Sequence, residues 1–127
     1  MLGAGSWGTA LAMHLARHEH PVRLWGRDPQ AIAALRDTRS HPSHPDVPMP
    51  DALEPVDDFE AAASADVVLV ACPSHAVREV SERARTSLAR DAVVVCTAKG
   101  IEQDSGKTMS GVLEDVLGPK AHISVLS

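Results

Sequence analysis

The chain has 127 residues, and its 12 Lys and Arg against 17 Asp and Glu give a net charge of −5. This length predicts a single domain, residues 1–127, that is large enough to bury a core. The mild negative charge is spread out without a basic run, which argues against a nucleic-acid partner. No apolar stretch approaches the roughly 18 residues of a membrane span, and no basic start followed by an apolar run indicates a secretory leader. We therefore expect a cytoplasmic protein that is not inserted in a membrane.

Short apolar strands alternate with helices along the chain. Leu2 ends a possible first strand, which has only two residues before the first glycine. Further strands are predicted at residues 22–25, 66–72, 92–96 and 122–126. Because strands that are apolar throughout are buried on both faces, this alternation predicts a doubly wound, mostly parallel α/β sheet of the Rossmann type.

Local signals indicate where the helices begin and end. Helices are predicted at residues 9–17, 29–36, 59–64, 74–88 and 108–117. Side chains that typically cap a helix precede three of them, namely Asp28, Asp57 or Asp58, and Ser74. Gly118 is placed to end the last helix. Residues 37–55, rich in Pro, His, Ser and Asp, predict a loop that is too long for a plain connector and is therefore a candidate functional segment.

Ligands of a doubly wound sheet bind at the carboxyl ends of its strands. This rule selects four segments, residues 3–8, 25–28, 72–75 and 97–100. Gly3, Gly5 and Gly8 form the pattern G-x-G-x-x-G between a strand end and a helix start. In this pattern the first glycine permits a tight turn, the second lets a pyrophosphate approach, and the third lets the helix pack closely. The context favours dinucleotide binding over a purely structural turn.

The end of the second strand decides between NAD and NADP. NAD-binding proteins usually place an acid there for the ribose 2′-hydroxyl group, but this strand ends with Trp25 and Gly26. Arg27 is the first charged side chain, and it could pair with the 2′-phosphate of NADP. Asp28 is better explained as a helix cap before Pro29. The residues therefore favour NADP, with NAD as the alternative.

Other residues that could carry chemistry also lie at the strand ends. Lys99 directly follows a buried strand, where an ammonium group could bind an anionic substrate or polarise a carbonyl oxygen. Ser74 is better explained as a cap, and His75 as a surface histidine. Cys72 and Cys96 each end an apolar run, which favours buried free thiols over redox or metal chemistry. The paired histidines of the long loop have no convincing metal-ligand spacing, so no metal site is predicted.

Taken together, these motifs resemble the amino-terminal domain of NAD(P)H-dependent glycerol-3-phosphate dehydrogenase. The resemblance rests on "GAGSWGTALA", "LWGRDP", "HPDVPMP", "CPSHAVRE" and "TAKGIE", in this order and spacing. It implies reduction of dihydroxyacetone phosphate to sn-glycerol 3-phosphate for phospholipid synthesis. It also implies that Ser6 and Trp7 contact the cofactor, that Arg27 lies near the 2′-phosphate, and that Lys99 is shared by cofactor and substrate.

The resemblance also has departures. The family places an aromatic residue before Leu-Pro in the long loop, where this chain has Ser43, His44 and Pro45. Its first strand is longer, and it continues into a helical domain that carries the catalytic lysine. We therefore expect a fragment without a catalytic residue of its own, inactive alone, of marginal stability and able to self-associate, with a homodimer as one candidate assembly. Two alternatives remain at this point: another two-domain dehydrogenase, acting on a hydroxy acid or a ketopantoate-like substrate, and a non-catalytic nucleotide-binding module.

Overall fold

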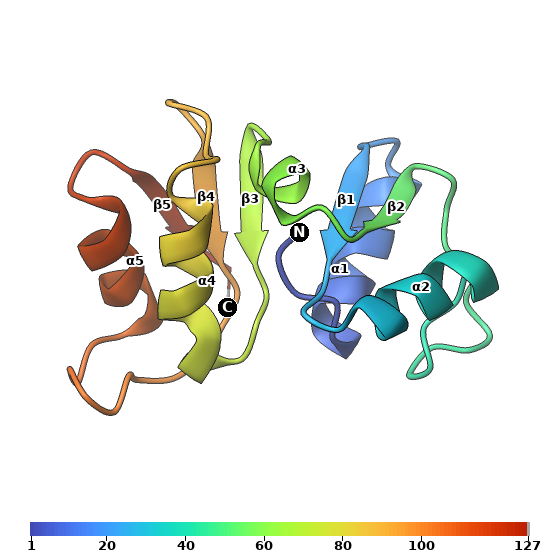
Figure 1. The fold of residues 1–127 in the computed structure, drawn as a ribbon, viewed down its shortest axis with the longest axis horizontal. Helices are drawn as coiled ribbons and strands as arrows, with labels where there is room; N and C mark the ends of the chain where they lie inside the picture. Colours follow the sequence, from blue (N-terminus) through green and yellow to red (C-terminus); the bar gives the residue numbers. More distant parts are fainter. Residues whose placement is uncertain (127) are drawn as a thin grey trace.

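The computed structural model describes residues 1–126, in which helices alternate with parallel strands (Figure 1). The strands are β1 Val22–Trp25, β2 Leu53–Val56, β3 Val67–Val70, β4 Val93–Cys96 and β5 His122–Val125. The helices are α1 Ser6–Arg17, α2 Pro29–Thr38, α3 Phe59–Ala63, the 3-10 turn η1 Ser74–Ala76, α4 Val77–Ala84 and α5 Met109–Leu117. This arrangement confirms the predicted α/β class.

The amino-terminal segment joins the two halves of the sheet. β1 pairs with β2, and β4 pairs with both β3 and β5, all in parallel. Leu2 lies between the halves and forms parallel bridges to Trp25 and Val70. Four backbone hydrogen bonds make the connection: Leu2 N to Leu69 O (2.8 Å), Ala71 N to Leu2 O (2.8 Å), Gly3 N to Trp25 O (2.9 Å) and Trp25 N to Met1 O (3.0 Å). The short first strand is therefore the centre of the sheet.

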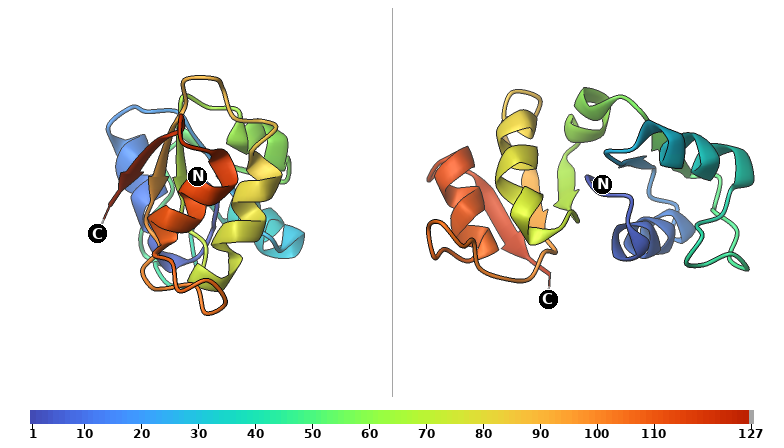
Figure 2. Two further views of the ribbon diagram at one scale, coloured as in Figure 1. Left: turned by 90° about the vertical axis from the view of Figure 1, so that its left-hand side faces the viewer. Right: turned by 60° about the horizontal axis from the view of Figure 1, so that its bottom comes forward.

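The helices cover the two faces of this sheet in separate groups. On one face, residues of α1 and α2 pack with Met1, Leu24 and Leu53 in one apolar cluster. On the other face, Leu2 packs with residues of α3 and α4, and a further cluster joins α4 and α5. Figure 2 shows α1 on one side of the strands and α4 and α5 on the other. Consecutive residues Met1 and Leu2 thus face opposite layers, as the alternation of side chains along a strand requires.

Most of the predicted helix ends are confirmed. The Asp28 carboxylate accepts a hydrogen bond from the Gln30 amide at 2.9 Å, and Asp58 accepts one from the Ala61 amide at 2.9 Å. Gly118 ends α5 with φ of +89°. The prediction for Ser74 was wrong, because Ser74 lies inside a 3-10 turn that follows Pro73 and its side chain caps nothing there. That turn runs directly into α4, so the helix has no extended residue at which a cap could sit.

The sequence analysis missed β2, which begins within the predicted loop of residues 37–55 and extends one residue beyond it. Pro55 pairs in register with Leu24, although proline cannot donate a hydrogen bond to a sheet. β2 is an edge strand whose partner is β1 alone, and an edge is where a strand tolerates proline. The Arg39 guanidinium ties the preceding loop to this strand by donating to Leu53 O at 3.0 Å and Pro50 O at 2.7 Å.

The two cysteines have the state that the sequence predicts. Cys96 is buried and Cys72 half-buried, and both are free thiols. Burial raises the pKa of Cys72 to about 11, which keeps the thiol protonated at neutral pH.

Within residues 1–126, no three His, Cys, Asp or Glu side chains gather as metal ligands would. In the same range, no helix has the length and apolar character needed to cross a bilayer.

Candidate functional site

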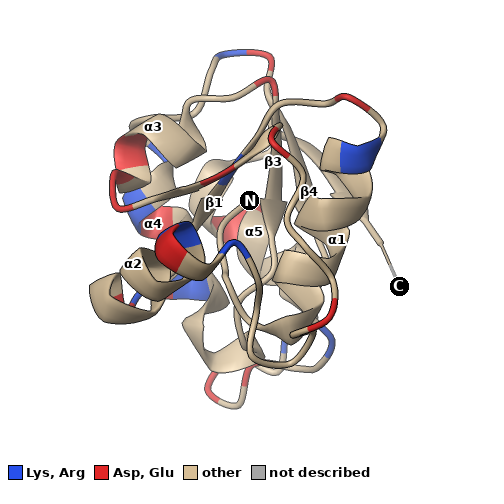
Figure 3. Cartoon of the chain, turned by 90° about the vertical axis from the view of Figure 1, so that its right-hand side faces the viewer, with Lys and Arg blue, Asp and Glu red and all other residues tan. Residues whose placement is uncertain are grey.

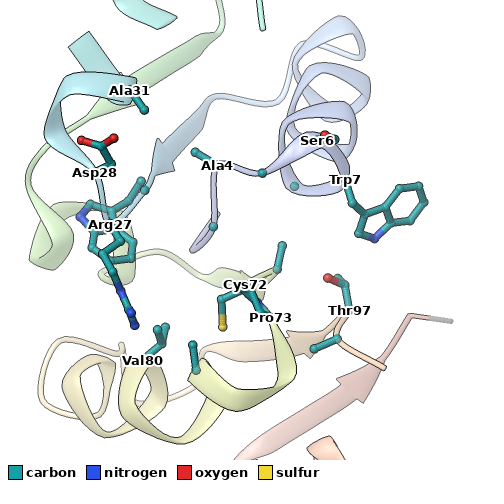
Figure 4. A pocket seen from close by; sticks show the side chains of 18 of the residues that line it. Ala4, Ser6, Trp7, Arg27, Asp28, Ala31, Cys72, Pro73, Val80 and Thr97 are labelled. Carbon is teal, nitrogen blue, oxygen red and sulfur yellow. The ribbon is translucent and has the colours of Figure 1, made fainter. Parts of the chain in front are cut away.

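A cavity of about 560 Å³ opens at the carboxyl ends of the central strands (Figure 4). Its walls come from the four segments that the strand-end rule selects, namely residues 3–8, 25–28, 71–73 with 75–76, and 97–98. Ala31, Ile32 and Val80 add apolar walls from α2 and α4. The cavity therefore lies where the chain changes from one half of the sheet to the other, which is the ligand position of doubly wound folds.

Gly3 and Gly8 are required by the packing of the glycine turn itself. Gly3 has φ of +129°, and a Cβ atom there would lie 2.5 Å from the carbonyl oxygen of Ala71. A Cβ atom on Gly8 would collide with the carbonyl oxygen of Gly3. These two glycines let the first strand turn sharply and let α1 pack against that turn.

No contact within residues 1–126 requires a glycine at position 5. Its φ of −75° and ψ of 178° are open to any residue, and a Cβ atom there would meet no atom within 4 Å. Gly5 nevertheless lines the cavity, directly before α1. The space that a side chain would fill is therefore left open for a ligand that approaches the backbone closely.

The start of α1 favours a negatively charged ligand. The helix begins at Ser6 without a side-chain cap and without an acidic residue in its first turn. Because the first amides of a helix have no partner within it, they are available to an anion and carry the positive end of the helix dipole. In the view of Figure 3, Lys and Arg are interspersed with Asp and Glu rather than gathered into a basic region.

Arg27 brings a cation to one end of the cavity. It follows β1 by two residues and lines the wall beside Asp28, whose carboxylate is occupied as the cap of α2. Figure 4 shows the Arg27 side chain reaching toward Val80 on α4. Its Nη2 donates to the Glu79 carboxylate at 3.0 Å, and the two side chains are 62% and 74% exposed. The guanidinium is therefore held near the cavity by a weak, solvent-exposed ion pair.

Ser6 and Trp7 flank the glycine turn. Both residues line the cavity, and Trp7 is 58% exposed, which is unusual for so large an apolar side chain. The hydroxyl oxygens of Ser6 and Ser43 lie 2.8 Å apart, and the His44 ring nitrogen lies 3.3 Å from the Ser6 carbonyl oxygen. The long loop thus lies against the glycine turn at the point where this chain departs from the family pattern.

Lys99 lies beside the cavity rather than in its wall. It is exposed and follows Ala98, the last residue of its segment that lines the cavity. The loop that carries Lys99 is anchored at Glu102, which accepts two hydrogen bonds from Arg78 of α4 at 2.8 and 2.7 Å. Arg78 and Ser105 lower the pKa of Glu102 to about 2. Lys99 therefore lies one residue beyond the cavity lining, at its rim.

Some residues of the site escaped the sequence analysis. Glu79, which contacts Arg27, was not predicted. His75 is exposed, as expected of a surface histidine, and it also lines the cavity, which was not predicted. The apolar walls from α2 and α4 were also missed. The position of α4 in the sequence could have predicted them. This helix starts just after the third segment of the cavity, so its first turns lie at the same edge of the sheet.

The chain has the features of a dinucleotide-binding domain of the doubly wound class: a glycine turn at the central strand, an uncapped helix start and a cavity at the switch point. A family model described as the N-terminus of NAD-dependent glycerol-3-phosphate dehydrogenase matches residues 1–127. The chain belongs to this family, as the motifs predicted.

Named relatives and a solved structure agree with this assignment. The chain is 43% identical, over its full length, to glycerol-3-phosphate dehydrogenase [NAD(P)+] from Thioalkalivibrio sulfidiphilus and to that from Tolumonas auensis, and it spans 39% of each relative. A crystal structure of glycerol-3-phosphate dehydrogenase from Coxiella burnetii matches 98% of this chain and 38% of that chain, with a TM-score of 0.87 and 29% identity. These relatives confirm the predicted cofactor class, NAD or NADP.

Proposed function

We propose that this chain forms the NADPH-binding part of an enzyme that reduces dihydroxyacetone phosphate to sn-glycerol 3-phosphate, a precursor for phospholipid synthesis. NADH is the alternative cofactor. The groups that complete catalysis lie outside residues 1–127, so the chain alone binds the cofactor and does not turn over. The observation that carries this proposal is Gly5, whose open side faces the cavity at an uncapped helix start.

The pyrophosphate would bind at the glycine turn. A phosphate placed over Gly5 meets the amides of the first turn of α1, including those of Ser6 and Trp7. A Cβ atom at residue 5 would occupy the same space. Gly3 and Gly8 would shape the turn without touching the ligand, and the helix dipole would favour its negative charge.

The adenosine end would bind at Arg27. A planar guanidinium pairs well with phosphate oxygens, and this one lies beside the apolar wall formed by Ile32 and Val80. An adenine ring buried on that wall would present its ribose toward Arg27. No free acid stands at the end of β1 for a 2′-hydroxyl group, because Asp28 already caps α2. These features support NADPH over NADH.

The opposite end of the cavity, near Thr97 and Ala98, would hold the nicotinamide. When bound, that ring supplies the hydride that reduces the ketone. Lys99 would place its ammonium group beside the substrate, where it could bind the phosphate or stabilise the developing charge on the carbonyl oxygen. The anchor between Arg78 and Glu102 would fix the loop that carries Lys99.

A calorimetric titration of this chain with NADPH and NADH tests the proposal. The wild-type chain should bind NADPH, and Arg27→Ala should weaken that binding by about tenfold through loss of a charged contact while NADH binding changes little. Arg90→Ala, an exposed arginine outside the cavity, is the matched control. Failure of the folded wild-type chain to bind either nucleotide would refute the proposed binding role.

A further inference from the structure

The ion pair between Arg27 and Glu79 connects the two halves of the sheet at the edge of the cavity. Arg27 follows β1, whereas Glu79 lies on α4 of the other half of the sheet, 52 residues further along the chain. Arg27 lines the cavity, and so do the chain neighbours of the pair, Asp28 and Val80. Glu79 itself lies just outside the lining, and its carboxylate contacts the guanidinium that the ligand would bind.

The pair leaves the guanidinium only partly engaged. One nitrogen, Nη2, donates to one oxygen of Glu79, at 3.0 Å. A phosphate that binds Arg27 with two parallel hydrogen bonds must share or displace that carboxylate. Because both side chains are largely exposed, displacing the Glu79 carboxylate from Arg27 costs little free energy. The negative charge of Glu79 is then screened by solvent and salt, but it is not removed.

We propose that Glu79 is a specificity-determining residue that competes with the 2′-phosphate of NADPH for the Arg27 guanidinium. This inference rests on the proposed function of Arg27. NADH has no 2′-phosphate and leaves the ion pair in place, so Glu79 opposes NADPH alone. Arg27 thus raises the ratio of NADPH to NADH affinity and Glu79 lowers it, so Glu79 narrows the preference for NADPH that Arg27 provides.

The test is the affinity ratio in five forms of the full chain, measured by calorimetry with NADPH and NADH: wild type, Glu79→Gln, Glu82→Gln, Arg27→Ala, and Arg27→Ala combined with Glu79→Gln. Glu79→Gln keeps the size of the side chain and removes its charge. We expect it to raise NADPH affinity about 3- to 10-fold, the order of one charge interaction at about 4 Å in water, with NADH affinity unchanged within about twofold. Glu82→Gln removes the same charge one turn further along α4, and within residues 1–126 the ion-pair partner of Arg27 is Glu79 rather than Glu82, so this variant should leave the ratio unchanged.

The comparison of Arg27→Ala with Arg27→Ala combined with Glu79→Gln separates competition from long-range repulsion. If Glu79 acts by occupying Arg27, the gain from Glu79→Gln disappears when Arg27 is absent. A gain that persists in this background, an equal gain from Glu82→Gln, or no gain in the wild-type background overturns the inference. Each of these results leaves the binding role intact, provided that the wild-type chain binds NADPH, whereas a wild-type chain that binds neither nucleotide refutes both.

Discussion

Arg78 and Glu102 form the most fully engaged ion pair at the carboxyl edge of the sheet. The guanidinium donates from Nε and Nη2 to the two carboxylate oxygens, at 2.8 and 2.7 Å. Such bidentate geometry is stronger and more directional than a single contact. The pair connects α4 to the loop after Lys99, and Lys107 and Asp115 extend the network to α5.

The first prediction concerns acid stability and follows from this pair. Arg78 and Ser105 lower the folded-state pKa of Glu102 from 4.5 to about 2. A carboxyl group with a depressed pKa contributes stability that is fully present above pH 4.5 and is lost as the pH falls toward 2. Glu102→Gln should therefore lower the free energy of unfolding at pH 6 and reduce its decline between pH 5 and 3, as measured by urea unfolding. Glu114→Gln, an exposed carboxylate outside the network, should keep the wild-type slope; an unchanged slope in Glu102→Gln would contradict the prediction.

The second prediction separates the ligand-related glycine from a structural one. Gly5→Ala should change the free energy of unfolding by less than about 1 kcal/mol, because its backbone angles suit alanine and its Cβ atom meets nothing. It should still weaken NADPH binding by roughly tenfold or more, because the added methyl group occupies the pyrophosphate position. Gly8→Ala should cost at least about 2 kcal/mol of stability through its clash with the Gly3 carbonyl group. Thermal melting and calorimetry distinguish the two, and equal destabilisation by both variants would count against the assignment.

The location of the site could be predicted because it depends on topology. Once strands and helices alternate, the carboxyl ends of parallel strands must lie at one edge, and for that reason each of the predicted segments 3–8, 25–28, 72–75 and 97–100 contributes residues to the cavity. The capping roles of Asp28 and Asp58 were equally local, since each side chain bonds within three residues of itself. Helix caps of this kind depend on short stretches of sequence, so they can be predicted without the tertiary structure.

The features that were missed depend on tertiary context. β2 forms despite Pro55 because β1 offers an edge where one missing donor is tolerated. Ser74 does not cap a helix because a 3-10 turn already continues into α4. Glu79 meets Arg27 from the opposite half of the sheet, and no local pattern indicates that pairing. The ligand role of Lys99 stays a prediction, since the structure places it at the rim of the cavity.

The third prediction tests that role. Lys99→Ala should weaken NADPH binding by this chain about tenfold, the order expected for loss of one contact to a charged group. In a full-length enzyme it should also raise KM for dihydroxyacetone phosphate, because the ammonium group would be shared with the substrate. Lys120→Ala, an exposed lysine that follows α5 and lies outside the four strand-end segments, is the control for general charge. Unchanged NADPH affinity in Lys99→Ala would remove Lys99 from the cofactor site.

The last prediction concerns the centre of the sheet. Leu2 is fully buried, packs against the cluster that contains Phe59 and Val80, and carries the backbone pairing between the two halves. Leu2→Ala leaves that pairing in place but opens a cavity beneath it, so we expect a loss of about 3 to 5 kcal/mol in the free energy of unfolding. In a domain of ordinary stability this is a large share of the total, and a chain of marginal stability would unfold. Ile101→Ala, which truncates a 63% exposed side chain, should cost less than about 1 kcal/mol in the same urea titration. Because the cavity lies between the two halves, NADPH binding should fall together with folding in Leu2→Ala, and retention of full stability would show that the halves are held together elsewhere.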